Sequence, residues 1–169
     1  MADKRPSRRT LNRLPAICVD EHITPAVASV FRTTFRVIEA GKDRRFRGRD
    51  ERDFIMDLYR ANAVFVTSDR VFADEFAKQR RQHAGAALIP TTYDSNDRIL
   101  LAQIVRGVIR ARCERSPFGM RNHVMIPKED GLHISLGGLD HLEFSWTRLG
   151  QIIAETPPDV QSTARKRRR

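Results

Sequence analysis

Short apolar runs alternate with segments of helical hydrophobic spacing through the first half of the chain. Four of the runs have the length and composition of buried strands. They cover residues 15–20, 35–39, 63–67 and 85–90. Three helices are predicted between them: one from Thr24 to about Arg32, one that begins near Asp50, and a short one beyond Asp69. Strands that alternate with helices predict a mainly parallel, Rossmann-like sheet of four strands, flanked by helices.

The pattern changes in the second half of the chain. A long amphipathic helix is expected from Asn96 or Asp97, and it should cover one face of the sheet. Its apolar positions are Ile99, Leu100, Ile104, Val105, Val108 and Ile109. After Pro117, two apolar segments flank the turn sequence of residues 128–131 and predict an antiparallel hairpin. The segments are residues 123–127 and 132–136, residues 142–146 are expected to add a strand, and residues 149–154 a short helix.

These patterns divide the chain of 169 residues into one domain with additions. The predicted parts are a disordered basic arm (1–14), the α/β domain (15–115), a hairpin extension (116–155) and a disordered basic tail (156–169). The sequence leaves open whether the hairpin extends the sheet edge, covers a core face or contacts a second copy in a homodimer. No apolar run is long enough to span a bilayer and no secretory signal is visible, so we expect a cytoplasmic protein without membrane contact.

Charge is concentrated at the two ends and in one internal loop. The formal net charge is +10, and the arm and the tail each hold five cations and one acid. They either attract nucleic-acid phosphates or serve as solubilising tails. Five basic residues crowd a short segment beside Gly41 and Gly48, and they are Lys42, Arg44, Arg45, Arg47 and Arg49. This basic loop is a candidate for binding nucleic-acid phosphates, and a solvated loop is the alternative.

Carboxylates stand where ligands bind in open α/β sheets. Asp20 and Asp69 each follow an apolar run that reads as a buried strand, and Asp50 opens a helix. Because ligands bind outside the carboxyl ends of such strands, we expect these acids to gather at one edge. A cluster of carboxylates favours a hard divalent cation, Mg²⁺ or Mn²⁺, and Asp74 could supply a further oxygen. Helix capping or solvation is the alternative for each acid, most of all for Asp50.

Divalent metals held by carboxylates can activate water and neutralise charge in phosphodiester hydrolysis. Other chemistries find less support. The five histidines are scattered and no glycine-rich phosphate loop follows the first strand, which disfavours a histidine mechanism and a nucleotide-binding enzyme. Cys18 and Cys113 form no disulfide framework or metal motif and are interpreted as core or incidental thiols.

The order and spacing of these acids and strands resemble the PIN-like domain superfamily, in particular its toxin-type branch. The resemblance covers about residues 15–90 and rests on the segments 19–25, 49–55 and 64–69. It implies a metal-dependent endoribonuclease that cleaves RNA. Such enzymes are often the toxin of a toxin–antitoxin pair, so a protein antitoxin is an implied partner. The resemblance also implies that Asp20, Asp50 and Asp69 are the catalytic metal ligands.

One departure from the family pattern keeps other functions open. Related sequences often place another acid two or three residues after the position of Asp69, where this chain has Val71 and Phe72. A noncatalytic module that binds nucleic acid or protein is therefore the alternative. A third hypothesis is a phosphorylation receiver domain, in which acids also follow the first and third strands. It is disfavoured because the region after Ile89 predicts a long helix where the receiver needs a fifth strand that ends in lysine.

Overall fold

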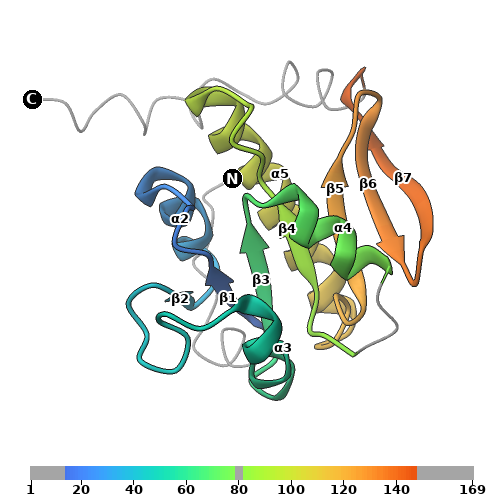
Figure 1. Cartoon of the computed structure of the whole chain (residues 1–169). Coiled ribbons are helices and arrows are strands. Elements are labelled where there is room, and N and C mark those ends of the chain that lie inside the picture. Colours follow the sequence, from blue (N-terminus) through green and yellow to red (C-terminus); the bar gives the residue numbers. More distant parts are fainter. Residues whose placement is uncertain (1–13, 79–81, 148–169) are drawn as a thin grey trace, which may run out of the picture.

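The computed structural model describes residues 14–78 and 82–147, which form one mixed sheet with helices on both faces (Figure 1). The strands are β1 (Ala16–Val19), β2 (Val37–Glu39), β3 (Ala63–Thr67), β4 (Ala86–Leu88), β5 (His123–Pro127), β6 (Gly131–Leu136) and β7 (Leu139–Ser145). The helices are α2 (Pro25–Arg32), α3 (Glu51–Arg60), α4 (Arg70–Lys78) and α5 (Ser95–Arg115). The predicted arm up to residue 13, the tail and the helix at 149–154 lie outside the described residues. No helix of the described part is both long and apolar enough to cross a membrane.

The sheet has seven strands in the order β2-β1-β3-β4-β5-β6-β7, so the prediction of four strands was wrong. Strands β2, β1, β3, β4 and β5 pair in parallel, and only β6 and β7 are antiparallel. The error has a topological cause. The first strand of the predicted hairpin pairs with β4, with Ala86 opposite Val124, and becomes the fifth parallel strand. The hairpin therefore extends the sheet edge, one of the three places left open by the sequence.

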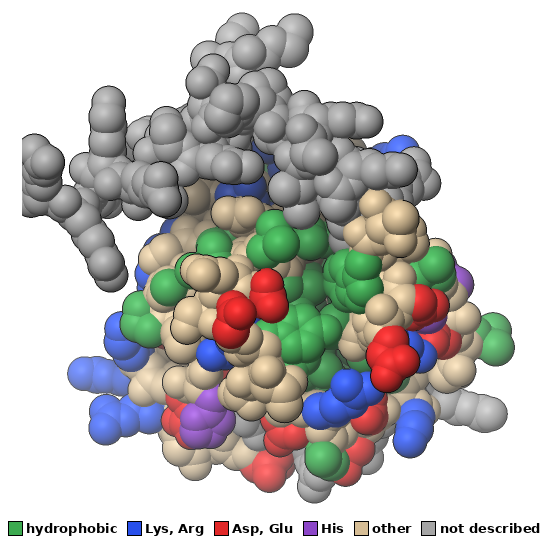
Figure 2. Space-filling model, turned by 90° about the horizontal axis from the view of Figure 1, so that it is seen from above, with side chains coloured by type: hydrophobic (Ala, Val, Ile, Leu, Met, Phe, Trp, Pro, Cys, Tyr) green, Lys and Arg blue, Asp and Glu red, His purple; other side chains and the backbone are tan. Residues whose placement is uncertain are grey.

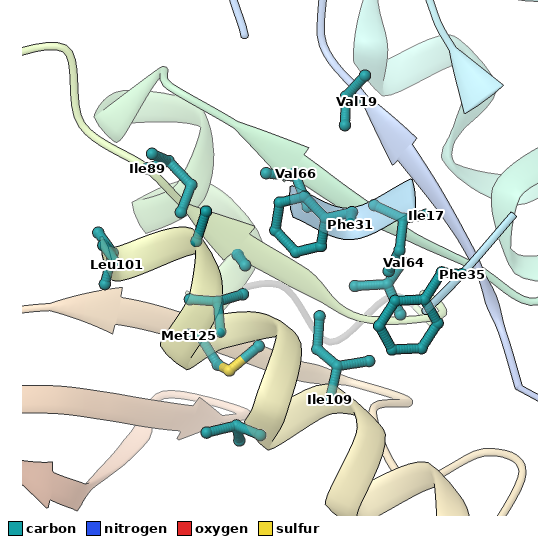
Figure 3. Packing of buried hydrophobic residues seen from close by; sticks show 14 of the residues in the cluster. Ile17, Val19, Phe31, Phe35, Val64, Val66, Ile89, Leu101, Ile109 and Met125 are labelled. Carbon is teal, nitrogen blue, oxygen red and sulfur yellow. The ribbon is translucent and has the colours of Figure 1, made fainter. Parts of the chain in front are cut away.

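Each face of the sheet packs against its own pair of helices. Ile17 and Val19 of β1 join the core under α2 and α5, whereas Cys18 joins the core under α3 and α4. In Figure 1, α3 and α4 lie in front of the sheet and α5 lies behind it. Figure 3 shows the first core, in which Phe31 of α2 and Ile109 of α5 belong to one cluster of buried side chains. Full burial of side chains of this size contributes about 1.5–3 kcal/mol each to folding.

The long helix α5 begins at Ser95, slightly earlier than its hydrophobic pattern predicts. The Asp94 side chain accepts a hydrogen bond from the backbone N–H of Asp97 at 2.8 Å, which caps the first turn. Five of its buried residues, Leu101, Ala102, Val105, Val108 and Ile109, follow the helical period. Leu100 was expected on this face, but it lies at its margin and is 36% exposed.

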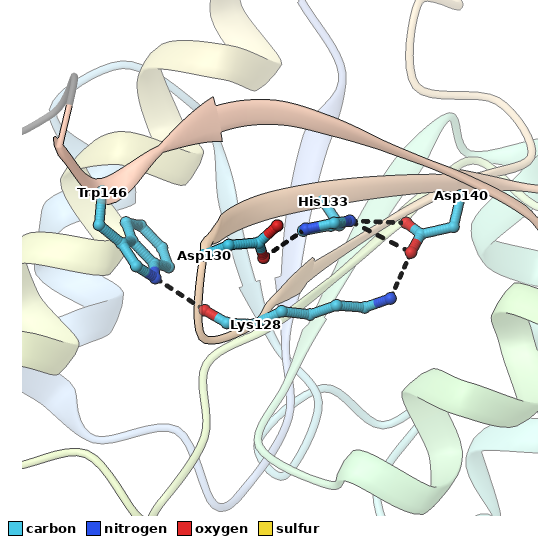
Figure 4. A network of polar contacts seen from close by, with 5 residues as sticks. All are labelled: Lys128, Asp130, His133, Asp140 and Trp146. Carbon is cyan, nitrogen blue, oxygen red and sulfur yellow. Dashed lines mark hydrogen bonds and ion pairs between the residues drawn. The ribbon is translucent and has the colours of Figure 1, made fainter.

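The turn between β5 and β6 is fixed by polar contacts with β7 (Figure 4). The ring nitrogens of His133 lie 2.7 Å from Asp130 Oδ1 and 3.1 Å from Asp140 Oδ2. Lys128 forms an ion pair with Asp140, and the indole N–H of Trp146 donates to the Lys128 carbonyl at 2.7 Å. Contacts between β5, β6 and β7 thus anchor the hairpin as a continuation of the sheet. Glycine is required at 131, because a Cβ there would lie 1.9 Å from the Phe144 carbonyl oxygen.

Both cysteines belong to the interior, as predicted. Their thiols are free and buried. Burial raises the pKa of Cys18 to about 12 and the pKa of Cys113 to about 11. Because thiolate is the reactive form, neither thiol is suited to nucleophilic chemistry near neutral pH.

A neutral histidine is built into the connection that leads to β4. His83 is 3% exposed, its Nδ1 accepts a hydrogen bond from the Gly85 N–H at 3.2 Å, and its ring meets Phe76 edge-on. Burial lowers the pKa of His83 to about 4. The folded state therefore resists protonation of this ring, whereas the unfolded chain accepts the proton near pH 6.5.

We expect stability to fall on acidification because of His83. The unfolded state binds more protons than the native state between the two pKa values, so the His83 contribution costs about 2 kcal/mol between about pH 7.5 and pH 5. His83→Asn keeps an acceptor for the Gly85 N–H but does not titrate. Urea unfolding at both pH values should show that the free energy of unfolding falls less in this variant than in the wild type. If His83→Asn lost as much stability between the two pH values as the wild type, the assignment to His83 would be wrong.

Candidate functional site

The strand order creates a switch point between β1 and β3. From β1 the chain moves to β2 on one side, and β3 then returns to the other side of β1. Crevices outside the carboxyl ends of strands at such points are the usual ligand sites of open α/β sheets. Asp20 follows β1 and Thr67 ends β3 at this position. Figure 2 looks onto the carboxyl edge and shows acidic side chains on both sides of an apolar centre.

Asp20 is held rigidly at the switch point. The residue is 4% exposed, its Oδ1 accepts from the Glu21 N–H at 2.6 Å, and its Oδ2 accepts from the Thr67 hydroxyl at 3.3 Å. Burial raises the pKa of the Asp20 carboxyl above its ordinary value, although the hydrogen bonds and nearby His22 oppose the shift. A carboxylate held in such a place is electrostatically costly, and a bound cation would offset that cost.

Asp69 is connected to Asp20 through one hydroxyl group. The Asp69 N–H donates to Thr67 Oγ1 at 3.0 Å, while Thr67 donates to Asp20. The Asp69 side chain itself accepts from the Phe72 N–H at 3.1 Å and thereby caps α4. Helix capping was the alternative for this acid in the sequence, and the structure gives it that contact. Thr67, to which the sequence assigned no role, links the two aspartates.

Asp20 and Asp50 line the same open cavity, which has a volume of about 370 Å³. Its other lining residues are Glu21, Ala40, Gly41, Phe46, Arg47, Gly48, Arg49 and Phe54. The structure therefore brings together two of the three predicted metal ligands. Of the residues described, Asp69 and Asp74 are not among the lining residues, and Asp74 lies 3.9 Å from Arg70 in an ion pair.

Most of the basic loop is neutralised by its own surroundings. Arg45 forms two side-chain hydrogen bonds with Asp43, and these lower the pKa of Asp43 to about 2. Arg49 lies 3.1 Å from an Asp57 oxygen, and Lys42 forms an ion pair with Glu39. Within the described part of the chain, Arg44 and Arg47 form no ion pair, and Arg47 also lines the cavity. Arg47 is therefore the best placed of the five predicted cations to contact an anion beside Asp20.

Three acids line this cavity, and two of them, the predicted ligands Asp20 and Asp50, fit one mode of magnesium binding. Mg²⁺ usually retains several waters and is held by one or two carboxylates together with substrate phosphates. Across residues 14–78 and 82–147, no group of three or more His, Cys, Asp or Glu side chains could hold a metal ion. A metal ion bound by Asp20 and Asp50 alone would need water and substrate to complete its coordination.

The sequence argument against a receiver domain was wrong about the fifth strand. The chain forms both the long helix α5 and a fifth parallel strand, β5, which is followed directly by Lys128. The first five strands also follow the flavodoxin-like order 2-1-3-4-5. However, Lys128 is paired with Asp140 of β7 and Asp69 caps α4. These contacts occupy both groups that a receiver would use, so the structure gives that hypothesis no direct support.

No match to this chain was found among protein-family models, curated proteins or solved structures. The resemblance to PIN-like domains therefore stays a prediction from the sequence.

Proposed function

We propose that the protein is a metal-dependent endoribonuclease of the PIN-like type. The observation that supports this best is the position of Asp20, a buried carboxylate at the β1–β3 switch point that lines an open cavity together with Asp50. Asp20 and Asp50 would hold Mg²⁺ or Mn²⁺. Asp69 would act as a positioning residue, because its backbone N–H orients the hydroxyl that donates to Asp20.

The residues of the cavity divide the work of hydrolysis among them. A bound divalent ion would lower the pKa of an attacking water and neutralise charge that develops on the phosphate. Two hydrogen bonds fix the Asp20 carboxylate, so its oxygens would stay in position to bind the ion. Arg47 lines the same cavity and can contact the phosphates of an RNA strand, whereas the Arg49 guanidinium is held by Asp57 and by the backbone carbonyls of Arg45 and Asp53. The toxin role and an antitoxin partner rest on the resemblance alone, and a homodimer rests on the predicted role of the hairpin alone.

The alternative function is a noncatalytic PIN-like module that binds nucleic acid or protein. Two observations favour it: Asp69 is used as a helix cap, and the described residues contain no three-ligand cluster. Such a module would retain the basic residues and bind RNA without turnover.

Metal removal separates the two functions. Incubation of a mixed RNA substrate with the full chain should give cleavage in Mg²⁺ or Mn²⁺, a loss of at least about 100-fold in EDTA, and recovery when the ion is restored. Gel analysis of the products reads out the reaction. RNA binding without cleavage under every divalent metal would favour the noncatalytic module, and cleavage that persists in EDTA would exclude the proposed mechanism.

A further inference from the structure

The cavity beside Asp20 adjoins a second cavity. The second cavity, of about 450 Å³, shares Asp20, Glu21 and Gly41 with the first. Two of the shared residues lie close together, because a Cβ at Gly41 would lie only 3.2 Å from Glu21 Cβ. Glycine at this position lets the loop approach the Glu21 side chain closely. Asp20 therefore lies where two adjoining lobes meet.

The two lobes differ in chemistry. The first lobe holds Asp50 together with Arg47 and Arg49 of the basic loop. The second, which we call the apolar lobe, is lined by Val19, Asp20, Glu21, Ile23, Pro25, Ala28, Arg32, Glu39, Gly41 and Lys42. Its apolar side chains come from β1, from the connection that follows it and from the first turn of α2. A lobe of this kind suits a flat, largely apolar group that has polar atoms at its edge.

Hydrogen-bond acceptors dominate the rim of the apolar lobe. Both of its cations, Arg32 and Lys42, form ion pairs with Glu39. Glu21 is more loosely held: its side chain is 62% exposed, and its carboxylate lies 3.8 Å from the ring of His22. A ligand edge that donates hydrogen bonds would find a carboxylate in Glu21. An edge on which two carbonyl oxygens flank a single N–H, as in uracil, would bring those oxygens against the carboxylate.

We propose that the apolar lobe is a nucleobase subsite that takes an unstacked base with an exocyclic amino group. Adenine, cytosine and guanine carry such a donor and uracil does not, so Glu21 would discriminate against uracil. This inference rests on the proposed function, because it places the phosphate of the same nucleotide beside Asp20. A base stacked inside a duplex cannot enter the lobe, so the substrate class is single-stranded RNA.

Binding measured without turnover tests the subsite independently of catalysis. Fluorescence anisotropy in EDTA would compare the full chain on short oligouridine strands that carry one central A, C, G or U. Any phosphate binding by the basic arm and tail would be the same for every strand, so its contribution cancels in the comparison. We expect the strands with A, C or G to bind about tenfold more tightly than oligouridine, the ratio that one additional charge-assisted contact can supply.

Two substitutions assign the preference to the apolar lobe. Glu21→Gln supplies an amide that can also donate to uracil, so the preference should fall to about twofold or less. Pro25→Trp should fill the lobe and remove the preference, whereas Ala26→Trp, at an exposed neighbour outside the lining, should retain it. Thermal unfolding of each variant confirms folding.

The outcomes distinguish this inference from the proposed nuclease. Equal binding of all four strands by the wild type would overturn the subsite, even if the protein cleaves RNA. A base preference that survives both Glu21→Gln and Pro25→Trp would also overturn it, because the base would then be read elsewhere. A preference that both variants remove would support the subsite, and if cleavage were absent it would identify a noncatalytic RNA-binding protein.

Discussion

The Asp20→Asn variant is expected to lose at least about 100-fold in metal-dependent RNA cleavage while remaining as stable as the wild type or becoming more stable. Asparagine has nearly the same shape and can still accept from the Glu21 N–H, and Thr67 can reorient its hydroxyl as an acceptor. It cannot supply a charged metal ligand. The loss of cleavage would therefore report the removed charge and not a collapsed site.

The stability half of this prediction follows from the raised pKa of Asp20. A carboxyl with a higher pKa in the native state than in the unfolded state reduces stability as pH rises through that native pKa. At neutral pH the ionised Asp20 reduces the stability of the wild type, and the uncharged asparagine of Asp20→Asn does not.

Parallel assays of cleavage and urea unfolding near neutral pH test both halves. Asp94→Asn is a matched control, because asparagine is also a good N-cap and Asp94 lines neither cavity. It should retain wild-type cleavage. If Asp20→Asn cleaves as well as this control, the assignment of Asp20 is wrong.

The largest loss of stability is expected for Phe65→Ala, at about 3–5 kcal/mol. Phe65 lies in the centre of β3, is 1% exposed, and packs edge-on against Phe54 of α3 and Phe72 of α4. Its removal would leave a cavity between the sheet and both helices. Phe54 also lines the cavity beside Asp20, so the loss of its contact with Phe65 would remove support from one of the residues that line the site.

Urea unfolding measures the effect of Phe65→Ala. If free energy depends on urea concentration with the same slope in variant and wild type, the difference between them is the change in stability. Phe65→Leu should cost clearly less, because it leaves a smaller cavity. Val71→Ala removes methyl groups from a side chain that is 67% exposed, so it should change stability by less than about 0.5 kcal/mol. A loss below about 1 kcal/mol in Phe65→Ala would show that this core relaxes to fill the space.

Local patterns in the sequence determined the positions of most helices and strands. The predicted strands at 63–67 and 123–127 match β3 and β5, and Pro25 begins α2 as its capping pattern indicated. These signals are local: a short buried run or a helical period depends on neighbouring residues alone. The sequence likewise placed Asp20 at the end of the first strand, because an acid directly after an apolar run can be recognised from the neighbouring residues alone.

Only the tertiary structure decided which of these parts meet. Pairing of β5 with β4 joins residues that are far apart in the chain, and it turned a predicted hairpin into the continuation of a seven-stranded sheet. The same long-range order placed Thr67 against Asp20 and brought Asp50 to the same cavity, while Asp69 became a helix cap. A carboxylate has the same sequence signature in a site and in a cap. Its role depends on strand order and loop path, which are set by contacts between distant segments.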